Sequence, residues 1–319
     1  MLGRMISSYP DQAFRDGYQT SAYPNNGGHM TLNCHRPTKT DNHLDFFGFI
    51  AERAHITSKK EAGVHWPWTM DWVLQNTRIT NLDRAHDRGT IRLCEKIRHM
   101  QDANRINTIV LYRSGYSAPR LLENLSGDTL TDTRWLEKSD GKFVDRLPYQ
   151  VLMHDGEHIH EFMIKSCFDV ATYILRRLPC WKKASLEDVA REIADSFVDT
   201  HGFKMIFLGT EIAKDLSYFY PDSIDRESVC PFNKGAKKGL AQVYEDGLPP
   251  GLYSLKKRKA YLRQRTGFSW EKLEHSLCEY AKYVERFKYL MDNPDRTPWQ
   301  WLYVQNPDPL YMLKDGLSA

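Results

Sequence analysis

Apolar residues recur at spacings of three and four over most of the chain, which is the period of an amphipathic helix. The pattern starts near Leu44, where Phe46, Phe49 and Ile50 share one face. The same period predicts helices in five further segments: 81–100, 159–178, 186–198, 203–218 and 269–290. A short apolar run at 106–112 fits a strand or a buried helix equally well, because its length does not separate the two. The pattern favours a mainly α-helical fold.

Polar residues at the ends of these segments supply capping signals. Such residues accept hydrogen bonds from the free N–H groups of a first helical turn. The pair Ser185 and Asp188 has the spacing of a capping box, and Gly202 suits the end of that helix. The other candidate N-terminal caps are Asp41 or Asn42, Thr69 before a helix that begins near Met70, and Ser269.

The helical pattern is missing at both ends of the chain. Residues 1–40 are rich in Gly, Asn, Tyr, Pro and Ser and show no period, which predicts an irregular arm. The segment 291–319 contains four prolines and predicts an extended tail. Between them, 41–290 is expected to form one helical catalytic domain, interrupted by a polar, turn-like stretch at 128–146.

Composition excludes several classes of protein. The 319 residues are 41% hydrophobic and 27% charged, which is ordinary for a globular chain large enough to bury a core. No apolar run approaches the roughly 18 residues that span a bilayer, and 1–20 lack the apolar core of a secretory signal. The six cysteines are scattered, so we expect reduced thiols, with neither a disulfide scaffold nor a zinc ribbon.

Charge is unevenly distributed along the chain. The net charge is only +3, but 226–290 holds 14 Lys and Arg against 7 Asp and Glu, or +7, which leaves −4 for the remainder. Aromatic residues make up 12% of the chain and are interleaved with these cations. Such a segment suits a polyanion such as nucleic acid, and a solvated helical face is the alternative.

The familiar nucleotide and hydrolase motifs are absent. The chain has no G-x-x-x-x-G-K-[ST], no G-x-G-x-x-G after a strand, no H-E-x-x-H and no G-x-S-x-G. A P-loop kinase and a dinucleotide-binding enzyme are therefore not expected. His154, His158 and His160 lie close together with Glu157 and Glu161, but their spacing favours a hydrated helix start over a metal site.

The first segment dense in chemical groups is 66–88. If it is helical, Arg78 and Asn81 are neighbours three positions apart, as are Arg84 and Asp87. One face would then combine guanidinium groups, which fit phosphate oxygens, with a carboxylate that could accept a proton. A surface ladder of salt bridges is the alternative.

The second such segment is 232–240, where Gly235 and Gly239 bracket lysines ahead of a helical pattern. Backbone N–H groups at a helix start, together with lysine charge, can form an anion site. Many loops have this composition, so the motif alone is weak.

Seven segments together resemble the alpha-glutamyl/putrescinyl thymine pyrophosphorylase family, which bacteriophages use to hypermodify thymine. The segments are 45–53, 67–71, 78–81, 84–90, 215–218, 234–240 and 273–283, in this order. The chain is also similar to the helical domain of phage hydroxymethyluracil DNA kinases, but it lacks their P-loop. It departs from the family pattern at Ile79, at Ala281 and at 232–235, so the resemblance leaves the amine open.

The resemblance implies a fold, a reaction and its partners. The fold would be a helical two-lobed architecture like that of helix-hairpin-helix DNA glycosylases. The substrate would be DNA whose hydroxymethyluracil a separate upstream kinase has pyrophosphorylated. The enzyme would displace pyrophosphate with the amine of an amino acid or polyamine. No cofactor is certain, although Mg²⁺ could accompany the pyrophosphate. The setting would be the cytoplasm of an infected bacterial host, with no membrane partner.

The resemblance and the chemistry together select candidate residues. The candidate catalytic groups are Asp71, Arg78, Asn81, Arg84, Asp87 and Asp215, with the three aspartates as alternative bases. Those for pyrophosphate and DNA are Lys234, Gly235, Lys237, Lys238, Gly239, Lys256, Lys257 and Arg258. Trp68, Glu279 and Lys282 are candidates for the substrate pocket. A glycosylase-like enzyme and a catalytically silent DNA-binding protein remain alternatives.

Overall fold

The computed structural model describes residues 42–77, 79–114, 122, 159–201, 205–245 and 247–293. The chain divides into two units, Met1–Asn33 and Cys34–Ala319, and all described residues belong to the second. The predicted arm at 1–40, the polar stretch at 128–146 and the tail beyond residue 293 lie outside the described residues. So does the histidine cluster, apart from the backbone of His160 in a helix.

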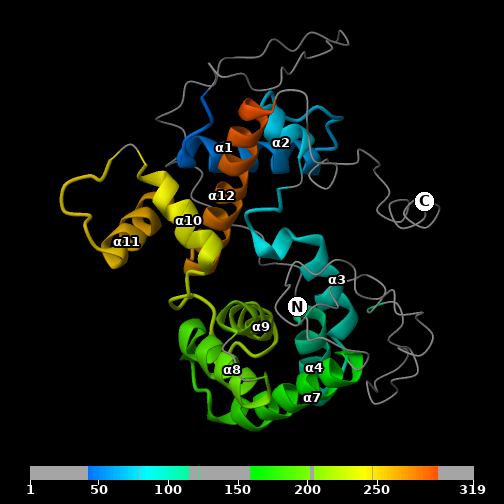
Figure 1. The fold of residues 1–319 in the computed structure, drawn as a ribbon. Helices are drawn as coiled ribbons and strands as arrows, with labels where there is room; N and C mark the ends of the chain where they lie inside the picture. The colour runs from blue at the N-terminus through cyan, green and yellow to red at the C-terminus, as the bar shows by residue number, and fades with distance from the viewer. Residues whose placement is uncertain are drawn as a thin grey trace. The chain divides into compact units, whose positions relative to one another are not determined.

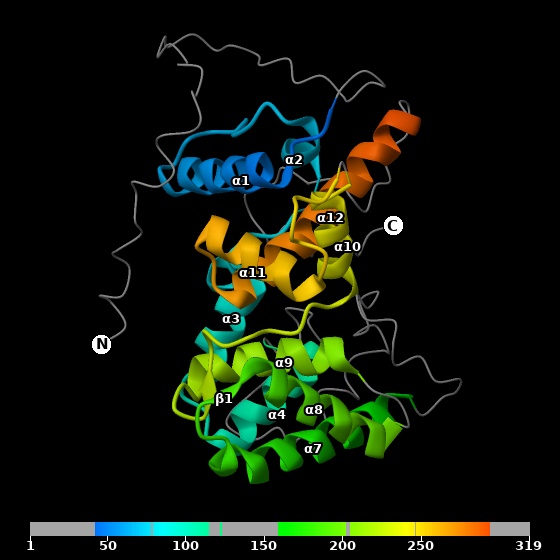
Figure 2. The same cartoon turned by 90° about the vertical axis from the view of Figure 1, so that its left-hand side faces the viewer.

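The described part of the chain is mainly helical, as the apolar period predicted (Figures 1 and 2). The helices of the first half are α1 (Phe46–Glu61), α2 (Trp72–Asn76), the 3₁₀ turn η1 (Arg84–His86), α3 (Arg88–Ile97) and α4 (Asp102–Arg113). Those of the second half are α7 (Ile159–Arg177), η3 (Leu178–Cys180), α8 (Leu186–His201), α9 (Ile206–Phe219), α10 (Lys234–Val243), α11 (Leu255–Thr266) and α12 (Trp270–Asp292). Two strands, β1 (Ala184–Ser185) and β2 (Ile224–Asp225), pair in parallel.

Local capping determines where several helices begin. Ser185 Oγ accepts from the N–H of Asp188 and donates to its carboxylate, so the predicted pairing of these two residues at the start of α8 is confirmed. Ser269 caps α12 as predicted. The cap of α1 is Asp45, which accepts from Gly48 N at 2.6 Å, and not Asp41 or Asn42. Both are too far upstream, because a cap side chain reaches only the next two or three N–H groups.

Two predicted helix starts are wrong for the same reason. The cap of α2 is Asp71 and not Thr69, whose hydroxyl instead accepts from the N–H of Asp71. The segment 81–100 is not one helix, because Asp87 caps α3 and only η1 precedes it. An aspartate in extended conformation interrupts helical hydrogen bonding and starts a new helix. The ambiguous run at 106–112 is helical and lies within α4.

Buried apolar side chains form two clusters. The first joins α3, α4, α7, α8 and α9, where α8 and α9 pack side by side (Figure 2). The second joins α1, α2, α10 and α12. Trp270, at the start of α12, packs against both. The two-lobed, glycosylase-like arrangement stays a prediction. No helix among the described residues is long and apolar enough to cross a membrane.

Candidate functional site

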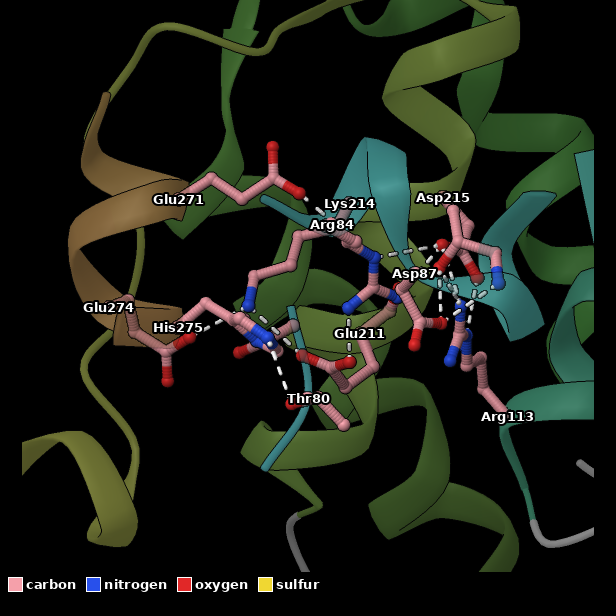
Figure 3. A network of polar contacts seen from close by, with 12 residues as sticks. Thr80, Arg84, Asp87, Arg113, Glu211, Lys214, Asp215, Glu271, Glu274 and His275 are labelled. Carbon is pink, nitrogen blue, oxygen red and sulfur yellow. Dashed lines mark hydrogen bonds and ion pairs between the residues drawn. The ribbon is translucent and has the colours of Figure 1, made fainter. Parts of the chain in front are cut away.

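A buried ion network surrounds Asp215 on α9 (Figure 3). Arg84, from η1, donates to Asp215 Oδ1 through Nε at 3.2 Å and Nη2 at 2.8 Å, and also pairs with Glu211. Arg113, from α4, donates to both carboxylate oxygens of Asp215. The Asp215 side chain is fully buried. The structure therefore brings together two of the candidate residues, Arg84 and Asp215. It also adds Arg113 and Glu211, which were not among the candidates from the sequence.

The network continues from Lys214 to α12. The Lys214 side chain is fully buried, and Nζ donates to Glu211 at 3.0 Å and to Glu274 at 2.8 Å. Glu271, one turn before Glu274, accepts from Arg226 at 3.0 Å and lies 4.0 Å from Arg84. The four cations of this network, Arg84, Arg113, Lys214 and Arg226, thus match four carboxylates, Glu211, Asp215, Glu271 and Glu274.

Mutual attraction keeps these buried groups charged. Burial by itself would raise the pKa of Glu211, but Arg84 and Lys214 hold it well below its usual value. Burial would likewise lower the pKa of Lys214, but Glu211 and Glu274 raise it well above the ordinary value. Because both oxygens of Asp215 already accept from guanidinium groups, this carboxylate is placed to hold Arg84 and Arg113 in position and not to take a proton from a substrate.

Asp87 and Asn81 lie beside this network, but their side chains hold the backbone. Asp87 accepts from the N–H and hydroxyl of Thr90, and that hydroxyl accepts from Arg113 at 3.1 Å. Asn81 donates to the carbonyl of His86 at 2.6 Å. The expected helical face that carries guanidinium, amide and carboxylate groups is not formed, because 79–83 is not helical. Arg78 lies outside the described residues.

The loop 79–81 is bound tightly between α1 and α12. Arg53 of α1 donates to the carbonyls of Ile79 at 3.1 Å and Thr80 at 3.0 Å. On α12, Glu279 accepts from the N–H of Thr80 at 3.0 Å, and His275 Nε2 lies 2.8 Å from the carbonyl oxygen of Asn81. These contacts fix the backbone directly after position 78.

Two of the three candidates for the substrate pocket contribute to this region. Lys282 donates to Glu279, whose side chain is only 2% exposed. Burial would raise the pKa of Glu279, but Lys282 and His275 lower it to about 2. Trp68 is placed elsewhere: its indole N–H donates to the carbonyl of Val64 at 2.7 Å, and Lys60 lies over its ring.

Asp71 contacts α12 at Tyr283, away from Glu274, where the buried ion network reaches this helix. It caps α2 by accepting from Leu74 N at 2.9 Å, and it accepts from the hydroxyl of Tyr283 at 2.6 Å. Burial raises the pKa of Asp71, against the lowering effect of these hydrogen bonds. Tyr283, the partner of Asp71, packs with aromatic residues of α1. The network around Asp215 instead reaches α12 at Glu274, through Lys214. Asp71 therefore lies in a different site from Asp215 and Asp87.

The lysine-glycine segment forms α10 itself and not a loop in front of a helix. A Cβ on Gly239 would lie 1.9 Å from the carbonyl oxygen of Leu277, and one on Gly235 would lie 2.5 Å from Cys278 Sγ. Both glycines therefore allow close packing of α10 on α12. Gly235 also lines the cavity described next, whereas Gly239 does not, so the anion-site role stays a prediction for Gly235. Lys234, Lys237 and Lys238 lie on the exposed side of the helix.

A cavity of about 810 Å³ opens at the first turn of α10. Lys234 and Lys237 line it, together with Lys259 of α11 and the ion pair between Arg191 and Glu187 on α8. Neither Lys234 nor Lys237 has a carboxylate partner among the described residues. Lysine charge and the positive end of a helix act together here, so the cavity suits a phosphate group. The sequence motif around Gly235 and Gly239 predicted the two lysines as anion ligands. No motif in the sequence around Arg191 indicated that this residue would line the same cavity.

The remaining candidates for DNA binding differ in exposure. Lys256 and Lys257 are exposed at the start of α11, whereas Arg258 donates to the carbonyls of Leu252 and Tyr253. Lys238 forms an exposed ion pair with Glu285 of α12. The described residues contain no group of three or more His, Cys, Asp or Glu able to hold a metal ion.

Residues 40–149 match the family model of the 5-hmdU DNA kinase helical domain. The match covers about a third of the chain and includes Asp71, Arg84, Asp87 and Arg113. It relates this part of the chain to that domain, so the similarity to it that the motifs indicated is confirmed. No curated protein and no solved structure matches the chain. The assignment to the thymine pyrophosphorylase family stays a prediction.

Proposed function

We propose that this protein hypermodifies DNA by displacing pyrophosphate from 5-pyrophosphoryloxymethyluracil with the amine of an amino acid or polyamine. The observation that carries the proposal is the match of 40–149 to the helical domain of 5-hmdU DNA kinases in a chain that has no P-loop. A helical domain of that kind without a kinase motif fits a step that uses the kinase's product.

The proposed reaction forms one bond and breaks one. The amine nitrogen attacks the exocyclic methylene carbon, and pyrophosphate leaves with the bonding electron pair of the carbon–oxygen bond. The nitrogen must be neutral to attack, so its proton passes to a base. The negative charge on the departing group is stabilised by cations placed before the reaction begins.

The cavity at α10 is the proposed site for phosphate groups of the substrate. Lys234 and Lys237 lie in the first turn of α10, and Lys259 reaches the cavity from α11. Burial lowers the pKa of Lys259, whose ammonium lies 4.1 Å from the ring centre of Phe232. Lys256 and Lys257 extend the positive charge along α11. Mg²⁺ would enter with the pyrophosphate, and no step is assigned to a metal held by protein side chains.

Asp71 is the proposed base among the three aspartates. Its neighbours are a hydroxyl and a backbone N–H, and its raised pKa makes it a better proton acceptor. Asp215 is committed to two guanidinium groups, and Asp87 to Thr90. In this proposal the network around Asp215 positions η1, α4, α9 and α12 and does not touch the reacting atoms.

A nucleoside digest tests the proposal. DNA that contains hydroxymethyluracil is pyrophosphorylated by a suitable kinase and ATP, then incubated with this protein and a pool of amino acids and polyamines, with and without EDTA. Mass spectrometry of the nucleosides should show a thymidine derivative carrying one added amine, and released pyrophosphate should equal it. Asp71→Asn should reduce product strongly, whereas the exposed Asp222→Asn should not.

A catalytically silent DNA-binding protein is the second candidate, because Asp87 and Asp215 are both occupied by structural contacts. DNA binding without pyrophosphate release, on verified substrate, would favour it and contradict the transferase. An abasic product would instead indicate a glycosylase.

A further inference from the structure

A loop joins α10 to α11 (Figures 1 and 2). It carries an aromatic ring, that of Tyr253, which is exposed to solvent. Tyr253 is 76% exposed, whereas the other exposed large apolar residues of the described chain range from 37% to 47%. No ring contact or side-chain hydrogen bond of Tyr253 is found among the described residues. Two further apolar side chains are exposed nearby, Leu248 in the loop and Leu255 at the first position of α11. A large ring so accessible, next to such apolar residues, indicates a surface that contacts another molecule.

The backbone of this loop is nevertheless held in place. Arg258 donates to the carbonyls of Leu252 at 3.0 Å and Tyr253 at 3.1 Å. Leu252 N donates to the carbonyl of Pro249, and Ser254 caps α11. Because the chain on both sides of Tyr253 is already ordered, a partner that contacts the ring does not have to order the loop first.

The surroundings of the ring are strongly basic. Helix α11 contains six Lys and Arg and no Asp or Glu. Four of them are engaged within the protein: Arg258 with the two carbonyls, Lys259 over Phe232, Arg263 over Trp270, and Arg265 over Phe47. Lys256 and Lys257, directly after the loop, are exposed and have no carboxylate partner among the described residues.

We propose that Tyr253 is a stacking platform for an unpaired base of DNA, with Lys256 and Lys257 contacting the phosphates beside that base. An aromatic ring next to a cationic track is how single strands are bound without sequence preference, since every base has a face to stack. A base inside an intact duplex offers no such face. The inference rests on the proposed function only in taking DNA as the substrate, and it adds that an unstacked base is held outside the cavity at α10.

The test measures binding of the full chain to fluorescent oligonucleotides. One set carries 2-aminopurine in a single-stranded gap, and the other carries it in a continuous duplex. We expect Tyr253→Ala to weaken binding to gapped DNA about tenfold and to leave the slope of affinity against salt unchanged, because both lysines still bind their phosphates. Tyr253→Phe should bind like the unmodified chain, and so should Leu248→Ala, which removes apolar surface without removing a ring. Lys256→Ala with Lys257→Ala should lower the salt slope by about 0.7 for each phosphate that is no longer bound.

The fluorescence of 2-aminopurine reports stacking directly. The unmodified chain should quench it in gapped DNA, and Tyr253→Ala should not. Equal affinity and equal quenching for the two proteins would overturn the inference. So would an equally large weakening on gapped and continuous DNA, or a dependence on Tyr253 seen only with vesicles of anionic lipid. Far-ultraviolet circular dichroism confirms that each variant is folded.

The outcomes also separate this inference from the proposed function. Binding that depends on Tyr253 without any hypermodified nucleoside in the digest would leave the stacking platform in place and reject the transferase. If the digest shows a hypermodified nucleoside but Tyr253→Ala binds like the unmodified chain, the transferase is supported and the stacking platform is rejected.

Discussion

In the network around Asp215, every cation lies beside a carboxylate, and Arg84, Arg113 and Lys214 are withdrawn from water. In the cavity at α10, Lys234 and Lys237 are exposed and lack such partners among the described residues. A buried charge without a partner is very costly, so the network had to be completed within the chain. An exposed lysine is hydrated and remains free to bind an anion. The number of Lys and Arg residues in a segment therefore says little about its role. Cations paired with carboxylates stabilise the fold, whereas exposed cations without a carboxylate partner are available to bind a ligand.

Breaking the network at its centre should have the largest effect. Asp215→Asn leaves two buried guanidinium groups without their shared carboxylate, and we expect it to destabilise the fold by about 3–5 kcal/mol. Chemical denaturation measures this, with Asp222→Asn as an exposed control expected to stay within about 0.5 kcal/mol. A stable Asp215→Asn protein that binds DNA but forms no product would instead make the network a reaction site.

The pair of Glu279 and Lys282 should give a smaller, pH-dependent effect. The pKa of Glu279 is lowered from 4.5 to about 2, so its stabilisation is complete above about pH 4.5 and is lost as the pH falls toward 2. We expect Glu279→Gln to cost about 2–3 kcal/mol at pH 7 and less at pH 3. Glu285→Gln on the same helix breaks only the exposed pair with Lys238 and should cost below about 1 kcal/mol. A destabilisation by Glu279→Gln that does not change with pH would contradict this assignment.

Substitutions of the glycines in α10 test whether close packing of α10 on α12 positions Lys234 and Lys237. Gly239→Ala places a methyl group against the backbone of Leu277 and should destabilise by about 1–3 kcal/mol. Gly235→Ala meets only the rotatable thiol of Cys278, and the better helix propensity of alanine should offset much of its cost. Thermal unfolding of the two variants checks the order. Equal effects would show that the packing is not limited by the Leu277 backbone.

Removing the unpaired cations should change binding and not folding. Lys234→Ala combined with Lys237→Ala should weaken DNA binding about tenfold, or ~1.4 kcal/mol, and lower the salt slope by about 0.9 for each phosphate of duplex DNA that is no longer bound. Lys288→Ala is the matched control, because its ammonium is already paired with Glu245. Inorganic pyrophosphate as competitor distinguishes a pyrophosphate site from a site for the DNA backbone. Unchanged binding of the double variant would contradict the role proposed for this cavity.

Helix content and most helix positions followed from the sequence alone. The period of apolar residues depends on neighbours three and four positions away, and a cap depends on the next two or three N–H groups. The cap at Ser185 and the long helix after Ser269 were therefore predictable. Arg84 and Asp215 were named as catalytic candidates, but their contact with each other was not predicted, and the catalytic role stays a prediction.

Only the tertiary structure decided what the charged residues and the glycines do. Arg84 and Asp215 are 131 positions apart, and Lys214 and Glu274 are 60 apart, so no local pattern joins them. One signal was available: α9 is apolar on most sides, so Glu211, Lys214 and Asp215 within it had to be buried and paired. Their partners, the use of Asp71 and Asp87 as caps, and the packing of Gly239 on α12 depend on which surfaces meet in three dimensions.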